Sequence, residues 1–245
     1  MTEDEAIDRM FLDTPQLGPG SDAQTRKVLS LLRRTDFSTV LDVGCGSGRQ
    51  TRVLAAELDA VIDAVELRQP FLDELKERAT QAGVAERIRP HQLDMAALAT
   101  RFSNVDLLWS EGAAYSIGFA NALETWHDVM AHGGLLALSE LTWLSAEPPE
   151  IARAFFEEGY PDMRDIAGNI EHCERAGYRV LTTHELPAEC WGAGFYDVLG
   201  PRARELAQDA DPVLSAYAAS MLEEIDVFER AEGSFGYVFY VLERP

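Results

Sequence analysis

Hydrophobic positions along the chain follow two alternating patterns, short continuous runs and longer stretches with apolar residues three or four positions apart. Continuous runs are typical of buried strands, and the three-to-four spacing is typical of helices that pack one face on a core. The runs predict seven strands, at residues 40–43, 61–66, 87–93, 105–110, 135–140, 178–183 and 236–242. The spaced stretches predict helices over about residues 21–34, 50–58, 70–82, 119–132, 166–176 and 214–228.

This alternation of strand and helix predicts a single α/β domain over residues 1–245, with a mostly parallel sheet. Residues 1–20 are expected to form a loosely structured N-terminal arm. Two segments, residues 144–165 and 185–235, are longer than ordinary connections and contain several aromatic side chains. Inserts of this length beside a ligand-binding sheet commonly form lids or substrate walls. The alternative is that they form contacts between subunits, which would make the protein a homodimer.

Charge limits the classes of partner. The chain has 245 residues, with 21 Lys and Arg against 42 Asp and Glu, which gives a formal net charge of −21 at pH 7. A surface this acidic repels phosphate backbones and anionic lipid headgroups, so we expect no nucleic-acid and no membrane partner. No apolar run approaches the ~20 residues that span a bilayer.

Cysteine and histidine usage indicates neither disulfides nor a metal. Cys45, Cys173 and Cys190 are widely scattered, and no CxxC motif or cysteine–histidine cluster occurs. No pair of histidines has the spacing of metal ligands on one helix face, so no metal is expected. The N-terminus is acidic, unlike the basic start of a secretory signal. These features together favour a reduced, cytoplasmic protein.

A glycine-rich turn, Asp42 to Gly48 (DVGCGSG), follows the first predicted strand and precedes a helix. Glycines let a backbone bend sharply and approach a ligand closely, and the N–H groups at the helix start face that ligand. This context favours a nucleotide-type ligand, and a purely structural turn is the alternative. Arg49 stands where the dinucleotide pattern GxGxxG needs glycine, which argues against a nicotinamide dehydrogenase.

Acidic residues follow the next two predicted strands. Glu66 ends the strand at residues 61–66, where a carboxylate can accept hydrogen bonds from both hydroxyls of a ribose; a solvated strand end is the alternative. Asp94 and Met95 lie just past the strand at residues 87–93. A carboxylate there can accept from an adenine amine while an apolar neighbour covers the ring, and a helix N-cap is the alternative.

Together these residues resemble the class I S-adenosylmethionine-dependent methyltransferases. Residues 42–48 are similar to motif I of that family, and Glu66 and Asp94 fall where its ribose and adenine contacts lie. Residues 110–115 (SEGAAY) resemble the small-molecule, ubiquinone-biosynthesis-like members. The resemblance implies a Rossmann-like, seven-stranded, mostly parallel sheet in the order 3-2-1-4-5-7-6, with the last strand antiparallel. It also implies S-adenosyl-L-methionine as cofactor.

The resemblance implies roles for the residues around the turn. Gly44, Gly46 and Gly48 would shape the loop around the methionine part of the cofactor. Asp42 would steady that loop and reach toward the methionine amino group through water. Ser110 would lie near the same amino group.

The resemblance also implies the nucleoside contacts. Glu66 would hold the ribose, and Leu67 would lie against the adenine. Asp94 would accept from the adenine amine, and the backbone N–H of Met95 would donate to a ring nitrogen.

Candidate residues for the methyl acceptor follow the fourth and fifth strands or lie in the inserts. Glu111 either binds or deprotonates the acceptor or holds a loop backbone, and Tyr115 either orients the acceptor or packs under a lid. Glu140 has a similar location, with a structural role as the alternative. Aromatic rings can enclose an apolar or cationic acceptor. The aromatic candidates are Trp143, Tyr160, Trp191 and Tyr196.

The predicted function is therefore S-adenosylmethionine-dependent methyl transfer to a small molecule by in-line displacement, in which the cofactor carries the activation. One alternative is another group transfer with the same cofactor, such as aminopropyl or carboxymethyl transfer. A second alternative is a non-catalytic module that only binds the cofactor.

Overall fold

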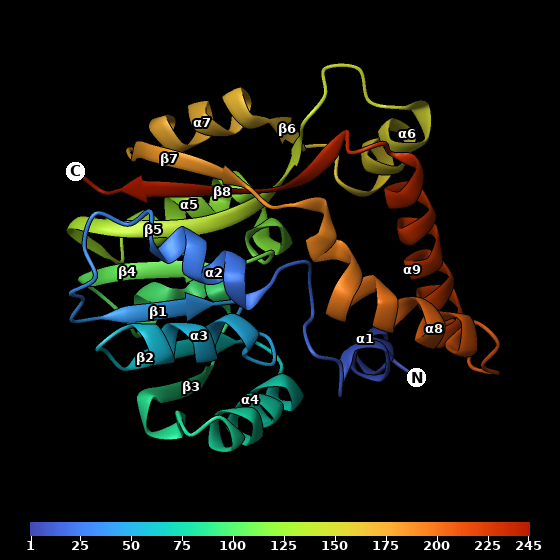
Figure 1. Ribbon diagram of the computed structural model, residues 1–245, viewed down its shortest axis with the longest axis horizontal. Helices are drawn as coiled ribbons and strands as arrows, with labels where there is room; N and C mark the ends of the chain where they lie inside the picture. Colours follow the sequence, from blue (N-terminus) through green and yellow to red (C-terminus); the bar gives the residue numbers. More distant parts are fainter.

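The computed structural model describes residues 1–245 as one sheet with helices on both faces (Figure 1). The strands are β1 (Val40–Val43), β2 (Ile62–Glu66), β3 (Ile88–Gln92), β4 (Val105–Ser110), β5 (Met130–Trp143), β6 (Arg164–Asp165), β7 (Arg179–Glu185) and β8 (Phe235–Glu243). The helices are α1 (Glu3–Phe11), α2 (Asp22–Leu29), α3 (Arg49–Glu57), α4 (Gln69–Gln81), α5 (Phe119–His127), α6 (Glu150–Gly159), α7 (Ile166–Arg175), α8 (Asp197–Leu206) and α9 (Pro212–Arg230). Short helical turns are η1 (Ala85–Arg87), η2 (Met95–Thr100), η3 (Ala114–Ile117), η4 (Ala188–Trp191) and η5 (Gly192–Tyr196).

The strand order is β3-β2-β1-β4-β5-β8-β7, and β8 is antiparallel to both of its neighbours. This order and the antiparallel last strand confirm the fold inferred from the sequence. One detail of that inference is wrong, because an eighth strand, β6, pairs with residues 142–143 at the end of β5. Two residues are too few to carry a hydrophobic period, so the sequence pattern did not reveal this strand.

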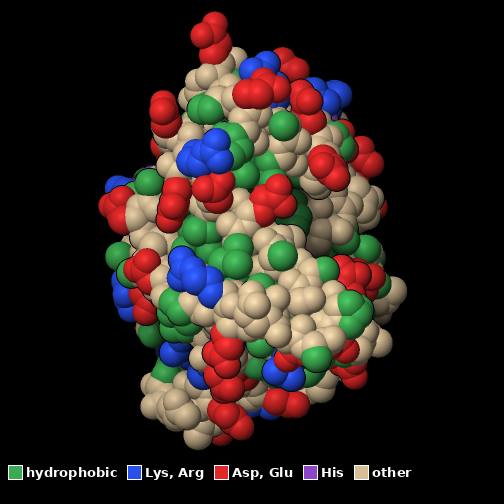
Figure 2. Space-filling model, turned by 90° about the vertical axis from the view of Figure 1, so that its right-hand side faces the viewer, with side chains coloured by type: hydrophobic (Ala, Val, Ile, Leu, Met, Phe, Trp, Pro, Cys, Tyr) green, Lys and Arg blue, Asp and Glu red, His purple; other side chains and the backbone are tan.

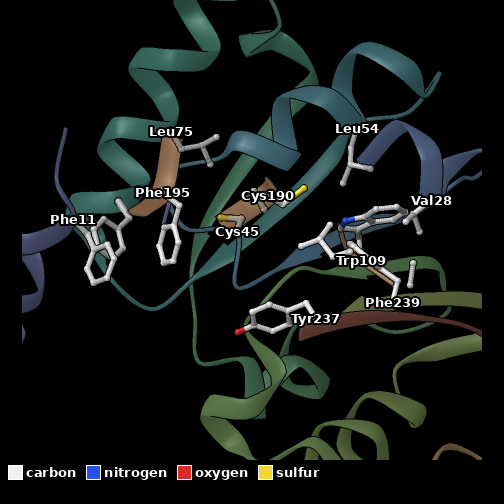
Figure 3. Packing of buried hydrophobic residues seen from close by; sticks show 14 of the residues in the cluster. Phe11, Val28, Cys45, Leu54, Leu75, Trp109, Cys190, Phe195, Tyr237 and Phe239 are labelled. Atoms are coloured by element: carbon white, nitrogen blue, oxygen red, sulfur yellow. The ribbon is translucent and has the colours of Figure 1, made fainter. Parts of the chain in front are cut away.

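The central strands are buried on both faces. All four residues of β1 are buried, and β2 and β4 flank this strand. Parallel strands in such positions read as continuous apolar runs, which explains why the sequence predicts them well. Figure 3 shows part of one core cluster, in which Trp109 of β4 packs 6.0 Å from Phe239 of β8 between ring centres, with Leu54 of α3 nearby.

Helix α5 is shorter than the apolar spacing predicts. It ends at His127, and β5 begins at Met130 rather than at residue 135. Met130 is only 1% exposed and pairs with Val105 of β4. The spacing therefore identified a buried residue, but pairing with β4 gives that residue strand conformation.

The expectation of a loosely structured arm at residues 1–20 is wrong, because α1 is a capped helix. Thr2 and Glu5 form a capping box, which satisfies free N–H groups at the helix start. Ala6 and Met10, one turn apart, are fully buried. Arg202 of α8 donates to the backbone oxygen of Met10 at 3.0 Å, which fixes the N-terminal helix to the second insert.

Both inserts contain helices that lie on one side of the sheet. Helix α6 belongs to residues 144–165, and α8 and α9 belong to residues 185–235. In Figure 1 these helices and α1 lie to the right of the sheet. Figure 2 views that side, where acidic side chains are spread over the surface between apolar ones. No helix in the structure combines the length and the apolar character needed to cross a membrane.

Candidate functional site

The glycine turn between β1 and α3 has a backbone conformation that other residues rarely adopt. Gly44, Gly46 and Gly48 have φ angles of +70°, +52° and +81°, all in the left-handed region. A residue with a Cβ atom is destabilised there by roughly 1–2 kcal/mol. The N–H groups of Gly44 and Cys45 both donate to the backbone oxygen of Val65, at 2.9 and 3.0 Å, which ties the turn to β2.

The turn is also packed too closely for side chains. A Cβ atom on Gly44 would lie 2.3 Å from the Cβ of Ala113, and one on Gly48 would lie 2.0 Å from Cδ1 of Leu75. Both distances are far inside van der Waals contact. The bare backbone therefore forms a cradle that a ligand can approach closely.

A cavity of about 820 Å³ adjoins this turn. That volume lies within the range of roughly 300–1,000 Å³ that is typical of ligand pockets. Most of the predicted site residues line the cavity: Gly44, Gly46, Gly48, Glu66, Leu67, Asp94, Met95, Glu111, Tyr115, Tyr160, Trp191 and Tyr196. Four predicted residues are absent from its wall, namely Asp42, Ser110, Glu140 and Trp143.

Glu66 ends β2 with both carboxylate oxygens anchored. Oε2 accepts from the N–H of Gly46 at 3.1 Å, and Oε1 accepts from the N–H of Arg68 at 2.9 Å. Burial raises the pKa of this carboxyl, and the bonds from the backbone N–H groups act in the opposite direction. Because a carboxylate oxygen can accept more than one hydrogen bond, Glu66 can still bind a diol at the cavity wall.

The residues expected around an adenine lie next along the wall. Leu67 is 61% exposed although it is apolar, so its side chain is free to cover a flat ring. Asp94 caps η2, because its Oδ1 accepts from the N–H of Ala96 at 2.8 Å, and its second oxygen makes no such bond. Trp126 donates from Nε1 to the backbone oxygen of Met95 at 2.9 Å, which holds this part of the wall in place.

Asp42 lies beneath the turn and outside the cavity wall, and its reach toward a ligand through water stays a prediction. It is fully buried and accepts from Oγ1 of Thr51 at 2.5 Å and from Nε2 of Gln50 at 3.4 Å. Gln50 also donates to the backbone oxygen of Cys45 at 3.3 Å. Burial raises the pKa of Asp42 to about 7. These contacts tie the end of β1 to the start of α3.

Ser110 and Trp143 also lie outside the cavity wall. Ser110 has no exposed surface, and its hydroxyl has no hydrogen-bond partner. The ring of Trp143 packs edge-on against Phe156 at 5.5 Å and against Phe235 at 6.3 Å between ring centres. Those two phenylalanines line the cavity, and Trp143 supports them from outside.

Glu111 lines the cavity, but its carboxylate is fully engaged. Oε1 accepts from Oγ1 of Thr25 at 2.7 Å and from Nε1 of Trp109 at 2.9 Å, and Oε2 pairs with Arg49. Only 7% of the Glu111 side chain and 9% of the Arg49 side chain are exposed. Both carboxylate oxygens are therefore engaged with donors of the protein itself. These contacts support the alternative in which Glu111 holds the loop after β4, and a role of Glu111 toward the acceptor stays a prediction.

Two tyrosine–carboxyl pairs lie at the other end of the cavity. Tyr160 donates to Oε1 of Glu140 at 2.9 Å, and Tyr196 donates to Oε1 of Glu224 at 2.7 Å. Burial raises the pKa of Glu140 to about 8 and raises the pKa of Glu224 above its ordinary value. Sequence reasoning missed Glu224, which lines the cavity. A signal existed, because this acid lies three positions after Met221 on the apolar face of α9.

The remaining wall of this end is aromatic. Tyr115 is 48% exposed and lies edge-on to Tyr160, with 6.3 Å between ring centres. Trp191 stacks on Phe228 at 5.2 Å and on Tyr237 at 5.7 Å. Tyr237 is a further wall residue that the sequence did not indicate, and Figure 3 shows its hydroxyl pointing away from Trp109 and Phe239.

The N-terminal segment covers the glycine turn. Leu17 lines the cavity, and its Cδ1 lies 2.7 Å from the position that a Cβ atom of Gly46 would take. Arg68 forms ion pairs with Asp4 and Asp8 of α1. The start of the chain therefore closes the cavity over the residues expected to bind a nucleotide.

The chain matches a protein-family model, and it is similar in sequence to curated proteins. Residues 40–134 match the model of the methyltransferase domain. The trans-aconitate 2-methyltransferase of Azoarcus sp. (strain BH72) is 27% identical over 201 residues, which cover 76% of this chain. The match spans 66% of that relative, just under two thirds of its length.

Solved structures share the fold. A SAM-dependent methyltransferase from Thiobacillus denitrificans, in complex with S-adenosyl-L-homocysteine, has a TM-score of 0.81 at 19% identity, over 97% of each chain. The cyclase SpnF has a TM-score of 0.74 at 18% identity, over 94% of this chain and 84% of that one. At these identities the likeness shows the fold, which proteins of different activity share.

Proposed function

We propose that this chain, which belongs to the class I S-adenosylmethionine-dependent methyltransferases, transfers a methyl group from S-adenosyl-L-methionine to a small molecule. Fold alone does not fix function, so the site has to support the proposal. The observation that carries it is the cavity that joins the glycine turn and Glu66 at one end to a chamber of aromatic side chains at the other.

The residues near the turn fit this cofactor. The glycine turn presents bare backbone at the cavity wall, because Cβ atoms on its glycines would collide with Ala113, Leu17 and Leu75, and this backbone suits the methionine end. Glu66 retains acceptor capacity for the ribose hydroxyls. Leu67 and Met95 supply apolar cover for the adenine, and Asp94 has an oxygen for its amine.

The cofactor supplies a methyl group already activated on a sulfonium, so the protein contributes mainly by positioning. Alignment of two reactants can correspond to effective molarities of ~10⁵ M or more. In this chain Tyr115, Tyr160 and Tyr237 line the space for the acceptor. Their rings exclude water from that space and restrict the orientation of the acceptor.

The net charge and the state of the cysteines support the proposed acceptor class and cellular compartment. A net charge of −21 opposes binding to nucleic acid, which supports a small-molecule acceptor. The three cysteines are buried and form no disulfide, which supports a reduced, cytoplasmic setting. A homodimer formed through the inserts stays a prediction, and light scattering of the purified protein measures it.

Calorimetric titration with S-adenosyl-L-methionine, S-adenosyl-L-homocysteine and NAD tests the cofactor assignment. We expect both sulfur nucleotides to bind and NAD not to bind. Gly46→Val should abolish binding, because φ is +52° and a Cβ atom would lie 2.7 Å from Leu17. Gly83→Val is the matched control, because Gly83 has φ +70° and no atom within 4 Å of its Cβ position. Affinity within about twofold of wild type in Gly46→Val would refute the assignment of this turn.

Transfer of a tritiated methyl group into cell extracts then tests the reaction. A labelled small molecule whose mass increases by one methylene supports methyl transfer. A product of other added mass would support aminopropyl or carboxymethyl transfer. Tight cofactor binding without any labelled product would support a binding module instead.

A further inference from the structure

The acceptor end of the cavity has carboxyl groups but no free cation. Two arginines line the cavity, and both are paired with acids near the cofactor end, Arg49 with Glu111 and Arg68 with Asp4 and Asp8. No lysine and no histidine lines the cavity. A carboxylate or phosphate on the acceptor would be taken out of water there without a counter-charge, which is costly.

Two carboxyl groups from different elements lie at this end. Glu224 of α9 lines the cavity, and Glu140 of β5 lies one hydrogen bond behind Tyr160. Each accepts a tyrosine hydroxyl, and Oε1 of Glu140 also accepts from the N–H of Leu141 at 3.0 Å. Because Glu224 lines the cavity and Glu140 does not, Glu224 is the carboxyl that an N–H donor on a ligand can reach.

The carboxyl of Glu224 acts on the space beside the tyrosines. Burial is the largest cause of the raised pKa of Tyr237, and the negative charge of Glu224 contributes to it. Because Tyr237 and Glu224 both line the cavity, the carboxylate of Glu224 gives the space beside Tyr237 a negative potential.

The aromatic wall adds to this preference. The faces of aromatic rings attract cations, and the attraction is strongest where water is excluded. Tyr115 is half-exposed and edge-on to Tyr160, so a ring face is open to a ligand. The phenylalanines Phe155 and Phe156 supply apolar surface for the rest of the ligand.

We propose that the methyl acceptor is an amine with an apolar body, which enters as its ammonium form and is selected by Glu224. This inference rests on the proposed function, because it names the substrate class of the same site. A neutral alcohol or phenol can bond to the tyrosines, but it does not supply a positive charge to pair with the carboxylate of Glu224. A carboxylate acceptor, such as the one named for the trans-aconitate relative, would be repelled by Glu224.

Methyl transfer to an amine requires a proton acceptor, and Glu224 can serve as one. An ammonium has no lone pair, so one N–H bond must break first, and its proton passes to the carboxylate of Glu224. Burial raises the pKa of Glu224, which makes it a better proton acceptor than an exposed glutamate. The nitrogen lone pair then forms a bond to the methyl carbon while the carbon–sulfur bond breaks. The electron pair of the broken carbon–sulfur bond stays on sulfur. The products are a methylated ammonium and S-adenosyl-L-homocysteine.

Binding of charge-matched probes to the protein saturated with S-adenosyl-L-homocysteine tests this proposal. The probes are a series of arylalkyl and alkyl amines, each with its isosteric alcohol and carboxylate, beginning with 2-phenylethylamine, 2-phenylethanol and 3-phenylpropanoate. Calorimetry should find at least one ammonium that binds about tenfold or more tightly than its alcohol, with the carboxylate weakest. Absence of any ammonium with this preference overturns the proposal.

Glu224→Gln tests the selecting residue, and the amide can still accept the hydroxyl of Tyr196. We expect it to remove the preference for ammonium over alcohol while leaving the affinity for S-adenosyl-L-homocysteine within about twofold. Glu223→Gln is the matched control, because Glu223 is the adjacent acid on α9, is exposed and does not line the cavity. This control should keep the preference.

Two further outcomes separate the possible errors. If Glu224→Gln weakens binding of S-adenosyl-L-methionine but not of S-adenosyl-L-homocysteine, Glu224 serves the sulfonium rather than an acceptor, and the proposal is overturned. If S-adenosyl-L-homocysteine does not bind the wild-type protein, the proposed function itself fails. The titration of the nucleotide alone distinguishes that failure from a wrong acceptor class.

Discussion

Replacing Gly44 by alanine tests whether the glycine turn is a rigid, closely packed wall. Gly44 has φ +70°, and a Cβ atom there would lie 2.3 Å from the Cβ of Ala113 and 3.3 Å from Cε of Met95. The methionine tip can move aside, but the Cβ of Ala113 is fixed to its backbone. Gly83→Ala is a matched control, because Gly83 also has φ +70° and no atom within 4 Å of its Cβ position.

Both substitutions place an alanine in the left-handed region, which lowers the free energy of unfolding by roughly 1–2 kcal/mol. Both also stiffen the unfolded chain, which has a small stabilising effect. The two substitutions differ in one further contribution to the free energy of unfolding. Only Gly44→Ala adds the overlap with Ala113, and overpacking of this kind costs about 1–3 kcal/mol. We therefore expect destabilisation of about 2–5 kcal/mol in Gly44→Ala and about 1–2 kcal/mol in the control. Each kcal/mol lowers the Tm of a chain this long by roughly 2–4 °C.

Urea unfolding followed by circular dichroism measures these free energies, and calorimetric titration measures the affinity for S-adenosyl-L-homocysteine. We expect the affinity to fall more than about tenfold in Gly44→Ala, because the turn or the loop at Ala113 must shift. The control should bind like the wild type. Equal losses of stability in the two variants, together with equal affinities, would refute the close packing of the turn.

Three other perturbations have defined outcomes. Glu66→Ala should weaken binding of S-adenosyl-L-homocysteine by about 10- to 150-fold in calorimetry, the effect of losing hydrogen bonds to a charged group, and a loss below about threefold would contradict the ribose role. Glu111→Ala should lower the free energy of unfolding by roughly 3–5 kcal/mol in urea titration, because it leaves Arg49 charged and buried; a lower kcat with unchanged stability would instead indicate a base. Burial raises the pKa of Asp42 to about 7 and of Glu140 to about 8, so the folded chain binds more protons than the unfolded chain from about pH 4 to about pH 8. Stability should therefore fall as pH rises through this window, and Glu140→Gln should flatten the fall by up to about 1.4 kcal/mol per pH unit. A pH profile of Tm that is identical in wild type and Glu140→Gln would refute this titration.

Particular residues show how far the sequence determines this site. Gly44 and Gly48 can be identified because a left-handed, closely packed backbone between a strand and a helix accepts little but glycine. Glu66 can be identified because it ends a short apolar strand that runs into the site. The central strands are buried on both faces, so their apolar runs stand out in the sequence and predict the fold.

The sequence does not show whether a side chain at the end of a strand reaches the cavity. Asp42 and Ser110 occupy positions where the pattern places ligand contacts, yet both are fully buried and lie outside the cavity wall. The N-terminal helix was missed for a related reason. Its buried residues, Ala6 and Met10, contact elements from the end of the chain, and nothing near residue 10 in the sequence reveals those elements.

The sheet, the glycine turn and the acid that ends β2 can be predicted from the sequence, because each depends on neighbours along the chain. The tertiary structure alone decided which acids are free to meet a substrate. Glu111 pairs with Arg49, 62 positions away, so its carboxylate is engaged within the protein. Glu224 comes from the second insert and reaches the wall of the same cavity. Because a cavity is formed by segments far apart in the chain, the charge at its acceptor end is a property of the fold rather than of any local pattern.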